Sequence, residues 1–292
     1  MGMRHFGPTS HNFMSQRSRL HYVDWGNPDA PLLILIHGNK DHCRSWDGVA
    51  RHLCDRWHVV APDLRGHGDS DWSPEGRYDF SSLTYDLAQL VFELGASRAA
   101  IVAHSMGAHV ALRYAGVYPE TLSHLVAVEA VGAPGDLEKQ YRQRSVADRY
   151  RHWIDTRRAA ADRTVRTFAS VDEAQARMQS ENPWLTAEQA RHLTIHGLRG
   201  SETGHYKWKF DTCLGLWPAA DNTEEEVFSL WRRIACPTLL IYGSESWQSR
   251  MGDDLVRHVP DVRRIDMAGS NHWPQHDNRE RFLTEITAFL ET

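Results

Sequence analysis

Two kinds of hydrophobic pattern alternate along this 292-residue chain. The first is a short, nearly uninterrupted apolar run such as "LLILI" at 32–36, which is typical of a strand buried on both faces of a sheet. The second places apolar residues three and four positions apart, as Leu83, Leu87 and Leu90 do within 80–94, and predicts an amphipathic helix. The apolar runs predict strands at 20–26, 31–36, 57–62, 99–103, 124–130, 236–243 and 262–267. The periodic segments predict helices at 45–54, 80–94, from 105 onward, at 250–258 and from 279 to the end.

The order of these elements predicts the fold class. Strands and helices alternate through the first part of the chain, which favours an α/β fold: a mostly parallel sheet covered by helices on both faces. The alternation then stops, and residues 136–230 are rich in Arg, Ala, Glu and Gln without a further run of the buried-strand kind. We therefore predict a core formed by 1–135 and 231–292, with a helical cap at 136–230 inserted after the strand that ends near Glu129. We expect this cap to be a mobile lid over the site, because such lids control access and exclude water.

Composition and charge indicate which classes of binding partner to expect. The formal net charge is -5, with no long block of either sign, so the chain lacks the basic stripe of a nucleic-acid-binding protein. Its four cysteines are scattered without a CxxC pair, which is typical of small buried residues in a reducing compartment. The N-terminal segment has no apolar core of a secretion signal, and no run is long enough to span a bilayer. These features predict a cytoplasmic protein that acts on a small molecule, without a nucleic-acid or membrane partner. They leave its oligomeric state open.

The residues that could carry chemistry directly follow predicted strands. They are His37-Gly38-Asn39, Ser105, Glu129, Gly243-Ser244-Glu245 and His272. In an open parallel sheet, ligands bind beyond the carboxyl ends of the strands. We therefore expect these residues to meet at one edge of the sheet.

Ser105 stands where a predicted strand passes abruptly into a helix, in "AHSMG" at 103–107. So tight a turn requires small neighbours, and Ala103 and Gly107 meet this need. The helix that begins there directs its free N–H groups and the positive end of its dipole toward the serine. The simpler interpretation of Ser105 is an ordinary helix N-cap.

These stretches resemble the motifs of the α/β-hydrolase fold superfamily, and in particular its esterase-like and lactonase-like serine hydrolases. "AHSMG" resembles the nucleophile elbow G-x-S-x-G with its first glycine replaced by alanine, and "IHG" with Asn39 resembles the oxyanion loop. "APDLRGHGDS" and "AGSNHW" resemble the loop after the next strand and the loop that carries the catalytic histidine. The resemblance implies that Ser105 is the nucleophile and His272 the base, with the oxyanion held by the backbone N–H groups of Asn39 and Met106. It implies no metal and no organic cofactor.

The acid of the triad has two candidates. Many members of the superfamily carry an aspartate three residues after the glycine that ends the strand at 236–243, where this chain has Ser246, with Glu245 one residue short. The branch that includes haloalkane dehalogenase-like proteins places its acid after the strand that follows the nucleophile helix, where this chain has Glu129. A carboxylate at the end of an apolar strand needs a partner, because burying it alone is costly. We favour Glu129 over Glu245; for both, the alternative is a salt bridge that holds the cap.

Other details separate the chain from relatives with a different chemistry. "HGN" resembles dehalogenases, in which such an asparagine helps to hold a halide. Those enzymes and the epoxide hydrolases of this fold need an aspartate nucleophile, whereas this chain has Ser105. Met106 stands where the dehalogenases have a halide-binding tryptophan. Both activities are therefore disfavoured.

Tryptophans are candidates for the pocket wall. The chain has 11 of them, and large aromatic side chains most often pack in cores. Trp46 lies just after the oxyanion loop and Trp273 directly after His272. We predict that these two line the substrate pocket.

The sequence thus predicts a serine hydrolase that cleaves a small to medium carboxylic ester or lactone through an acyl-enzyme on Ser105. A carbon–carbon bond hydrolase would use the same triad on the same fold and remains an alternative. A ligand receptor that kept the pocket without catalysis is a further alternative of a different class, because fold does not determine function.

Overall fold

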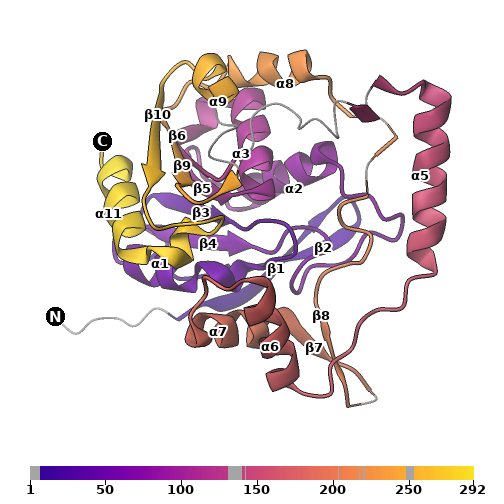
Figure 1. Cartoon of the computed structure of the whole chain (residues 1–292). Coiled ribbons are helices and arrows are strands. Elements are labelled where there is room, and N and C mark those ends of the chain that lie inside the picture. Colours follow the sequence, from indigo (N-terminus) through magenta and orange to yellow (C-terminus); the bar gives the residue numbers. More distant parts are fainter. Residues whose placement is uncertain are drawn as a thin grey trace.

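The computed structural model describes residues 7–130, 140–141, 143–202, 204–216, 218–219, 221–247 and 253–292. Its centre is an eight-stranded sheet in the order β1-β2-β4-β3-β5-β6-β9-β10 (Figure 1). The strands are β1 Thr9–Ser15, β2 Ser18–Asp24, β3 Leu32–Ile36, β4 His58–Pro62, β5 Ala99–His104, β6 Leu122–Val128, β9 Thr238–Gly243 and β10 Val262–Met267. β1 pairs with β2, and β2 with β4, in antiparallel fashion, and the remaining pairs are parallel. The predicted mostly parallel sheet is confirmed.

Helices cover both faces of this sheet. The core helices are α1 Asp47–Leu53, α2 Phe80–Glu93, α3 Met106–Val117, α8 Glu224–Trp231, α9 Asp253–His258, α10 Pro274–Asp277 and α11 Arg279–Leu290, with 3-10 turns η1 Cys43–Trp46 and η2 Pro119–Thr121. The apolar residues of α2, α3, α8 and α9 pack in one buried cluster, and those of α1 and α11 pack in another on the opposite face. In β3, Ile34 belongs to the first cluster and Leu33 and Leu35 to the second, which is why the strand is apolar at every position.

The cap is built from helices α5 Val146–Ala161, α6 Val171–Glu181 and α7 Ala187–Gly197 and from a small antiparallel pair, β7 Leu198–Gly200 and β8 Tyr206–Trp208. Its helices begin where a hydroxyl side chain can accept a free N–H of the first turn. Ser145, Ser170 and Thr186 do so at the starts of α5, α6 and α7. The cap is therefore mainly helical, as predicted, with a short β pair that the sequence pattern did not indicate.

The cap contacts loops that follow the carboxyl ends of β3 and β4. His42 Nε2 donates to the carbonyl oxygen of Leu193 in α7 at 2.9 Å. Trp72 Nε1 donates to the carbonyl oxygen of Lys209 at 3.2 Å, and the N–H of Asp211 donates to the carbonyl oxygen of Gly66 at 2.9 Å. The cap thus lies over the edge at which a ligand would bind, whereas its mobility stays a prediction.

Three further findings refine the sequence reading. Helix α8, most of which lies within the predicted cap range 136–230, packs against α3 and buries Val227, Phe228 and Trp231 in the core. Cys43, Cys54 and Cys236 are buried as expected, whereas Cys213 is half-buried. Among the described residues, no helix combines the length and hydrophobicity of a membrane span.

Candidate active site

Ser105 occupies a strained turn between β5 and α3. Its backbone has φ 50° and ψ −117°, a conformation that costs a residue with a side chain about 1–3 kcal/mol. The turn is held from below, because the N–H of Ser105 donates to the carbonyl oxygen of Val128 in β6 at 2.8 Å. Gly107 is required for close packing, since a Cβ there would lie 2.4 Å from the carbonyl oxygen of His37. The strain and the half-buried side chain distinguish Ser105 from an ordinary N-cap, and its side chain makes no cap hydrogen bond.

The loop after β3 lies against this turn. A Cβ on Gly38 would be 2.8 Å from His104 Nδ1 and 3.2 Å from Ser105 Cβ, so only glycine permits this approach. Asn39 follows directly and is exposed. Met106 is the first residue of α3, where backbone N–H groups have no partner within the helix. The predicted oxyanion donors therefore lie on two segments that meet at Ser105.

Glu129 and His272 form a hydrogen-bonded pair. His272 Nδ1 lies 3.2 Å from Glu129 Oε2, and the Glu129 side chain is fully buried whereas that of His272 is 37% exposed. The backbone N–H of Gly243 donates to Glu129 Oε1 at 2.6 Å, and Ser246 Oγ donates to Oε2 at 2.5 Å. Three donors thus surround the buried carboxylate, and these hydrogen bonds offset the cost of burying it.

Glu245 has a different place. It is exposed and accepts a hydrogen bond from the hydroxyl of its neighbour Ser244. Ser246, the next residue, is buried, and its hydroxyl donates to Glu129. The structure therefore brings Glu129, rather than Glu245, to His272. The sequence signal for Ser246 was its position three residues after Gly243, and its role as a donor to Glu129 was missed.

Glu129 is itself strained, with φ 53°. Its N–H donates to the carbonyl oxygen of Ile241 at 2.8 Å, which fixes the end of β6 against β9. Tyr242 Oη donates to the carbonyl oxygen of the next residue, Ala130, at 2.6 Å. These bonds aim the carboxylate inward, a feature that the sequence pattern does not reveal.

Two buried histidines support the site without titrating near neutral pH. His104 Nε2 donates to the carbonyl oxygen of His272 at 2.7 Å, and their ring centroids are 4.8 Å apart. Because His104 directly precedes Ser105, this bond holds the loop of His272 against the turn that carries Ser105. Burial lowers the pKa of His104 well below its usual value, and burial lowers that of His37 to about 3. His37 Nδ1 donates to the carbonyl oxygen of Gly38, and its Nε2 accepts the N–H of Leu64.

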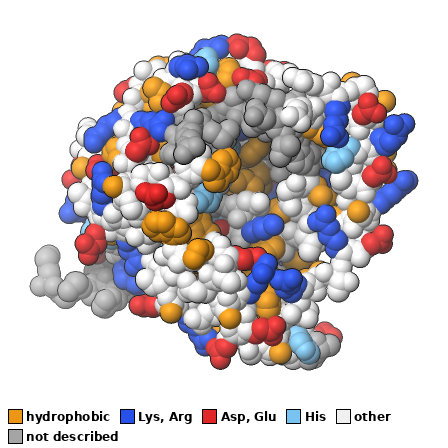
Figure 2. Space-filling view, in the orientation of Figure 1, with side chains coloured by type: hydrophobic (Ala, Val, Ile, Leu, Met, Phe, Trp, Pro, Cys, Tyr) orange, Lys and Arg blue, Asp and Glu red, His pale blue; other side chains and the backbone are white. Residues whose placement is uncertain are grey.

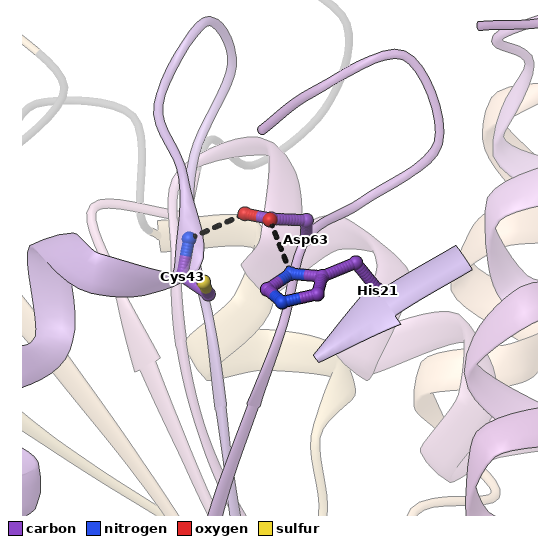
Figure 3. A group of neighbouring side chains, drawn as sticks. All are labelled: His21, Cys43 and Asp63. Atoms are coloured by element: carbon purple, nitrogen blue, oxygen red, sulfur yellow. Dashed lines mark hydrogen bonds and ion pairs between the residues drawn. The ribbon is translucent and has the colours of Figure 1, made fainter. Parts of the chain in front are cut away.

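The loop after β4 is organised by a buried carboxylate (Figure 3). Asp63 Oδ2 accepts His21 Nδ1 at 2.7 Å and the N–H of Asp69 at 2.9 Å, and Oδ1 accepts the N–H of Cys43 at 2.7 Å. These donors hold the pKa of Asp63 below its usual range despite its burial. Gly68 is required beside them because a Cβ there would lie 2.1 Å from the carboxyl carbon of Asp63. The hydrogen bonds of Asp63 thus fix the conformation of this loop.

The two tryptophans predicted to line the pocket separate. Trp46 is wholly buried in the cluster beneath the sheet, with its ring 6.4 Å from that of Phe282, so its expected place in the pocket wall is wrong. The cause is local: residues 43–46 form a 3-10 turn that directs Trp46 into the core. Trp273 lines a narrow cavity of about 20 Å³ between the loop after β3 and the cap. Its pocket role stays a prediction.

That cavity is lined by the core residues Lys40, Asp41, His42, Gly68 and Trp273 and by the cap residues Met178, Leu193, Gly197, Trp208, Lys209 and Phe210. Its size is about that of one water molecule. A substrate that enters between these walls must displace cap side chains. In the view of Figure 2, the surface of the molecule is hollowed between the core and α5.

Known proteins share this architecture. A family model described as "alpha/beta hydrolase fold" matches residues 31–279. Epoxide hydrolase 4 of Mus musculus is 33% identical over 291 residues, covering 94% of this chain and 76% of the relative. Epoxide hydrolase 1 of Caenorhabditis elegans is 24% identical over 289 residues, covering 94% of this chain and 68% of the relative.

Among solved structures, a thioesterase domain from the curacin biosynthetic pathway has a TM-score of 0.84 with 21% identity, covering 97% of this chain and 99% of that one. This likeness concerns the fold. The family model spans most of the chain, and the mouse relative is similar over nearly all of it. The chain therefore belongs to the alpha/beta hydrolase fold family.

Proposed function

We propose that this protein is a serine hydrolase that cleaves a carboxylic ester or lactone of small to medium size. The observation that carries the proposal is the strained Ser105 elbow beside a His272–Glu129 pair whose acid is fully buried and hydrogen-bonded. A strained nucleophile turn persists only where the surrounding structure holds it, and such strain gathers at functional sites. The relatives support hydrolysis as the reaction class.

The mechanism begins with attack of Ser105 Oγ on the substrate carbonyl carbon while His272 Nε2 takes its proton. Glu129 keeps the proton of His272 on Nδ1, so that Nε2 is free to act as the base. The backbone N–H groups of Asn39 and Met106 stabilise the oxyanion. His272 then protonates the leaving oxygen, and the acyl-enzyme remains. Water, deprotonated by the same histidine, releases the acid and restores Ser105.

Epoxide opening is the competing activity, because both relatives described above are named epoxide hydrolases. A covalent mechanism for it on this fold uses a carboxylate nucleophile, whose ester with the substrate is then hydrolysed. Here the elbow carries Ser105, and an ether formed by a serine would resist hydrolysis. The nucleophile therefore favours acyl transfer.

The test is a substrate panel with wild-type protein and Ser105→Ala. The panel holds p-nitrophenyl acetate, butyrate and octanoate, a γ-lactone, a vinylogous diketone and styrene oxide. We expect turnover of an ester or lactone by the wild type and none by Ser105→Ala. Turnover of styrene oxide alone, or equal ester turnover by both proteins, would contradict the proposal. Turnover of the diketone alone would move the reaction to carbon–carbon bonds.

A further inference from the structure

A second group of ligating side chains lies where the cap meets the core. His192 and His196 are four residues apart in α7, so they lie on one face of the helix. Asp47, the first residue of α1, faces them with its side chain only 5% exposed. Ligand atoms of these three residues all lie within 4.8 Å of one another. Two histidines and a carboxylate form a donor set that suits Zn²⁺ and similar transition metals.

The separation of two of the groups already suits a shared ion. His192 Nε2 lies 3.3 Å from Asp47 Oδ2. Two ligands about 2.1 Å from a tetrahedral metal lie about 3.4 Å apart. His192 Nε2 now donates to the carbonyl oxygen of Arg44 at 3.0 Å, so an ion there would take the place of that proton. Rotation of the half-exposed His196 would bring in the third ligand.

A cavity opens beside the cluster. It measures about 250 Å³, and its lining includes Asp47, His192, His276 and Arg279. His276 is only 8% exposed, and neither of its ring nitrogens has a hydrogen-bond partner in the described structure. A buried imidazole without partners is unusual, because buried polar groups are normally satisfied. The cavity thus offers room for water ligands of an ion, and the His276 imidazole on its wall is available as one further metal ligand.

Arg44 occupies the cation's position in this structure. Arg44 Nε donates to Asp47 Oδ1 at 2.8 Å, and Nη2 donates to Asp47 Oδ2 at 2.6 Å. Arg44 Nη1 lies 3.4 Å from His196 Nδ1. The guanidinium therefore bridges two of the three ligands. Its side chain is 27% exposed, so it can swing toward solvent. Arg44 would compete with a metal ion for the same groups.

The other ligating cluster shows the contrast. His21, Cys43 and Asp63 are also close together (Figure 3). Each Asp63 oxygen, however, accepts a backbone N–H, from Cys43 or Asp69, and a backbone donor cannot swing aside for an ion as the Arg44 side chain can. None of the three lines either cavity described above. That group serves as an internal brace.

We propose that Asp47, His192 and His196 bind a divalent transition-metal ion such as Zn²⁺ in exchange for Arg44. Because His192 and His196 belong to the cap and Asp47 to the core, the ion tethers α7 to α1. The site uses none of Ser105, Glu129 and His272, and its occupancy does not depend on the function proposed above.

The experiment titrates untagged, metal-free protein with Co²⁺ by visible absorption and with Zn²⁺ by calorimetry. We expect one ion per chain with the intense absorption of a four- or five-coordinate Co²⁺ site. His192→Ala and His196→Ala should each weaken binding by at least about tenfold, because each removes one of three protein ligands. His52→Ala, on the exposed side of α1, is the matched control and should bind like the wild type.

Arg44→Ala is the variant that tests the proposed competition between Arg44 and the ion most directly. Removing the competing guanidinium should tighten Zn²⁺ binding, and Zn²⁺ should raise the melting temperature of this variant more than that of the wild type. His272→Ala excludes binding at the catalytic pair and should leave the Co²⁺ spectrum unchanged. The proposal fails if the wild type binds no ion, if binding survives both α7 substitutions, or if Arg44→Ala weakens it. It also fails if His272→Ala abolishes the spectrum.

Discussion

Replacing Glu129 by glutamine exchanges a carboxylate for an amide of nearly the same shape, and the structure specifies how the amide must lie. The N–H of Gly243 donates to Oε1 at 2.6 Å and belongs to the backbone, so it cannot reverse its direction. The amide oxygen must therefore stay at that position. The amide nitrogen then faces Ser246 and His272, where the carboxylate accepted two hydrogen bonds.

An amide N–H at this place forces His272 into the wrong tautomer. Ser246 can rotate its hydroxyl and accept, but His272 Nδ1 must lose its proton to accept from the amide. Nε2 then carries the proton and cannot receive the one from Ser105. A corresponding change in a well-studied triad lowers kcat by about 10⁴-fold, which is about 5.5 kcal/mol of transition-state stabilisation. We expect Glu129→Gln to lower kcat by a factor of that order with KM little changed.

The assay is steady-state turnover of the best ester from the panel, with circular dichroism to establish that the variant is folded. Glu245→Gln is the matched control, because that side chain is exposed and bonds only to its neighbour Ser244 in the described structure. It should keep activity within a few-fold of wild type. A Glu129→Gln protein that is folded and nearly fully active would refute the reasoning, as would a larger loss from Glu245→Gln.

Three further predictions concern the support of the site. Ser246→Ala removes a charge-assisted hydrogen bond of about 1.5–3 kcal/mol and should lower kcat about 10- to 100-fold, with recovery in Ser246→Thr; equal loss in both would contradict it. Burial lowers the pKa of His37 to about 3, so below about pH 6.5 the unfolded chain binds a proton that the native state does not. The contribution of His37 to the free energy of unfolding is therefore complete above about pH 6.5 and falls as the pH drops toward 3, with a loss of about 2 kcal/mol by pH 5. Urea unfolding of wild type and His37→Gln should show a smaller pH 7-to-5 difference in the variant; an unchanged difference would disprove this. Trp46→Ala should lower the free energy of unfolding by about 3–5 kcal/mol, whereas Trp273→Ala should alter ester kinetics with little loss of stability. Thermal unfolding and ester kinetics of the two variants test this, and a stable Trp46→Ala beside an unstable Trp273→Ala would contradict it.

The sheet was predictable because its strands carry an uncommon signal. A strand buried on both faces is apolar at every position, as in β3, and few other elements look like that. β1 was missed for the opposite reason: it is an edge strand whose residues Thr9–Asn12 are all exposed, so it reads as polar loop. Its pairing with β2 depends on backbone hydrogen bonds, which side-chain patterns do not record.

The cap boundary shows a second limit. Glu224–Trp231 is amphipathic, and such a helix can bury its apolar face against either the cap or the core. Contact with α3 decides the matter, and no local signal in the segment encodes that contact. The same limit applied to Trp46, whose position beside a functional loop gave no information on which side of the sheet its ring would lie.

For the site, sequence position was informative wherever a motif fixes geometry. Ser105 and His272 stand at the ends of strands in recognisable loops, and the structure places the two loops in contact through His104. The acid was ambiguous because two strand ends converge on the same histidine. Only the fold shows that Glu129 points inward under positive φ while Glu245 points to solvent.

Covalent labelling tests the central claim most directly. A fluorophosphonate reacts with a serine that an adjacent base activates, and it reports the nucleophile without knowledge of the substrate. We predict one adduct per chain by intact mass spectrometry, located on the peptide containing Ser105, and no adduct in Ser105→Ala or His272→Ala. An unlabelled wild type, or labelling that persists in Ser105→Ala, would contradict the account.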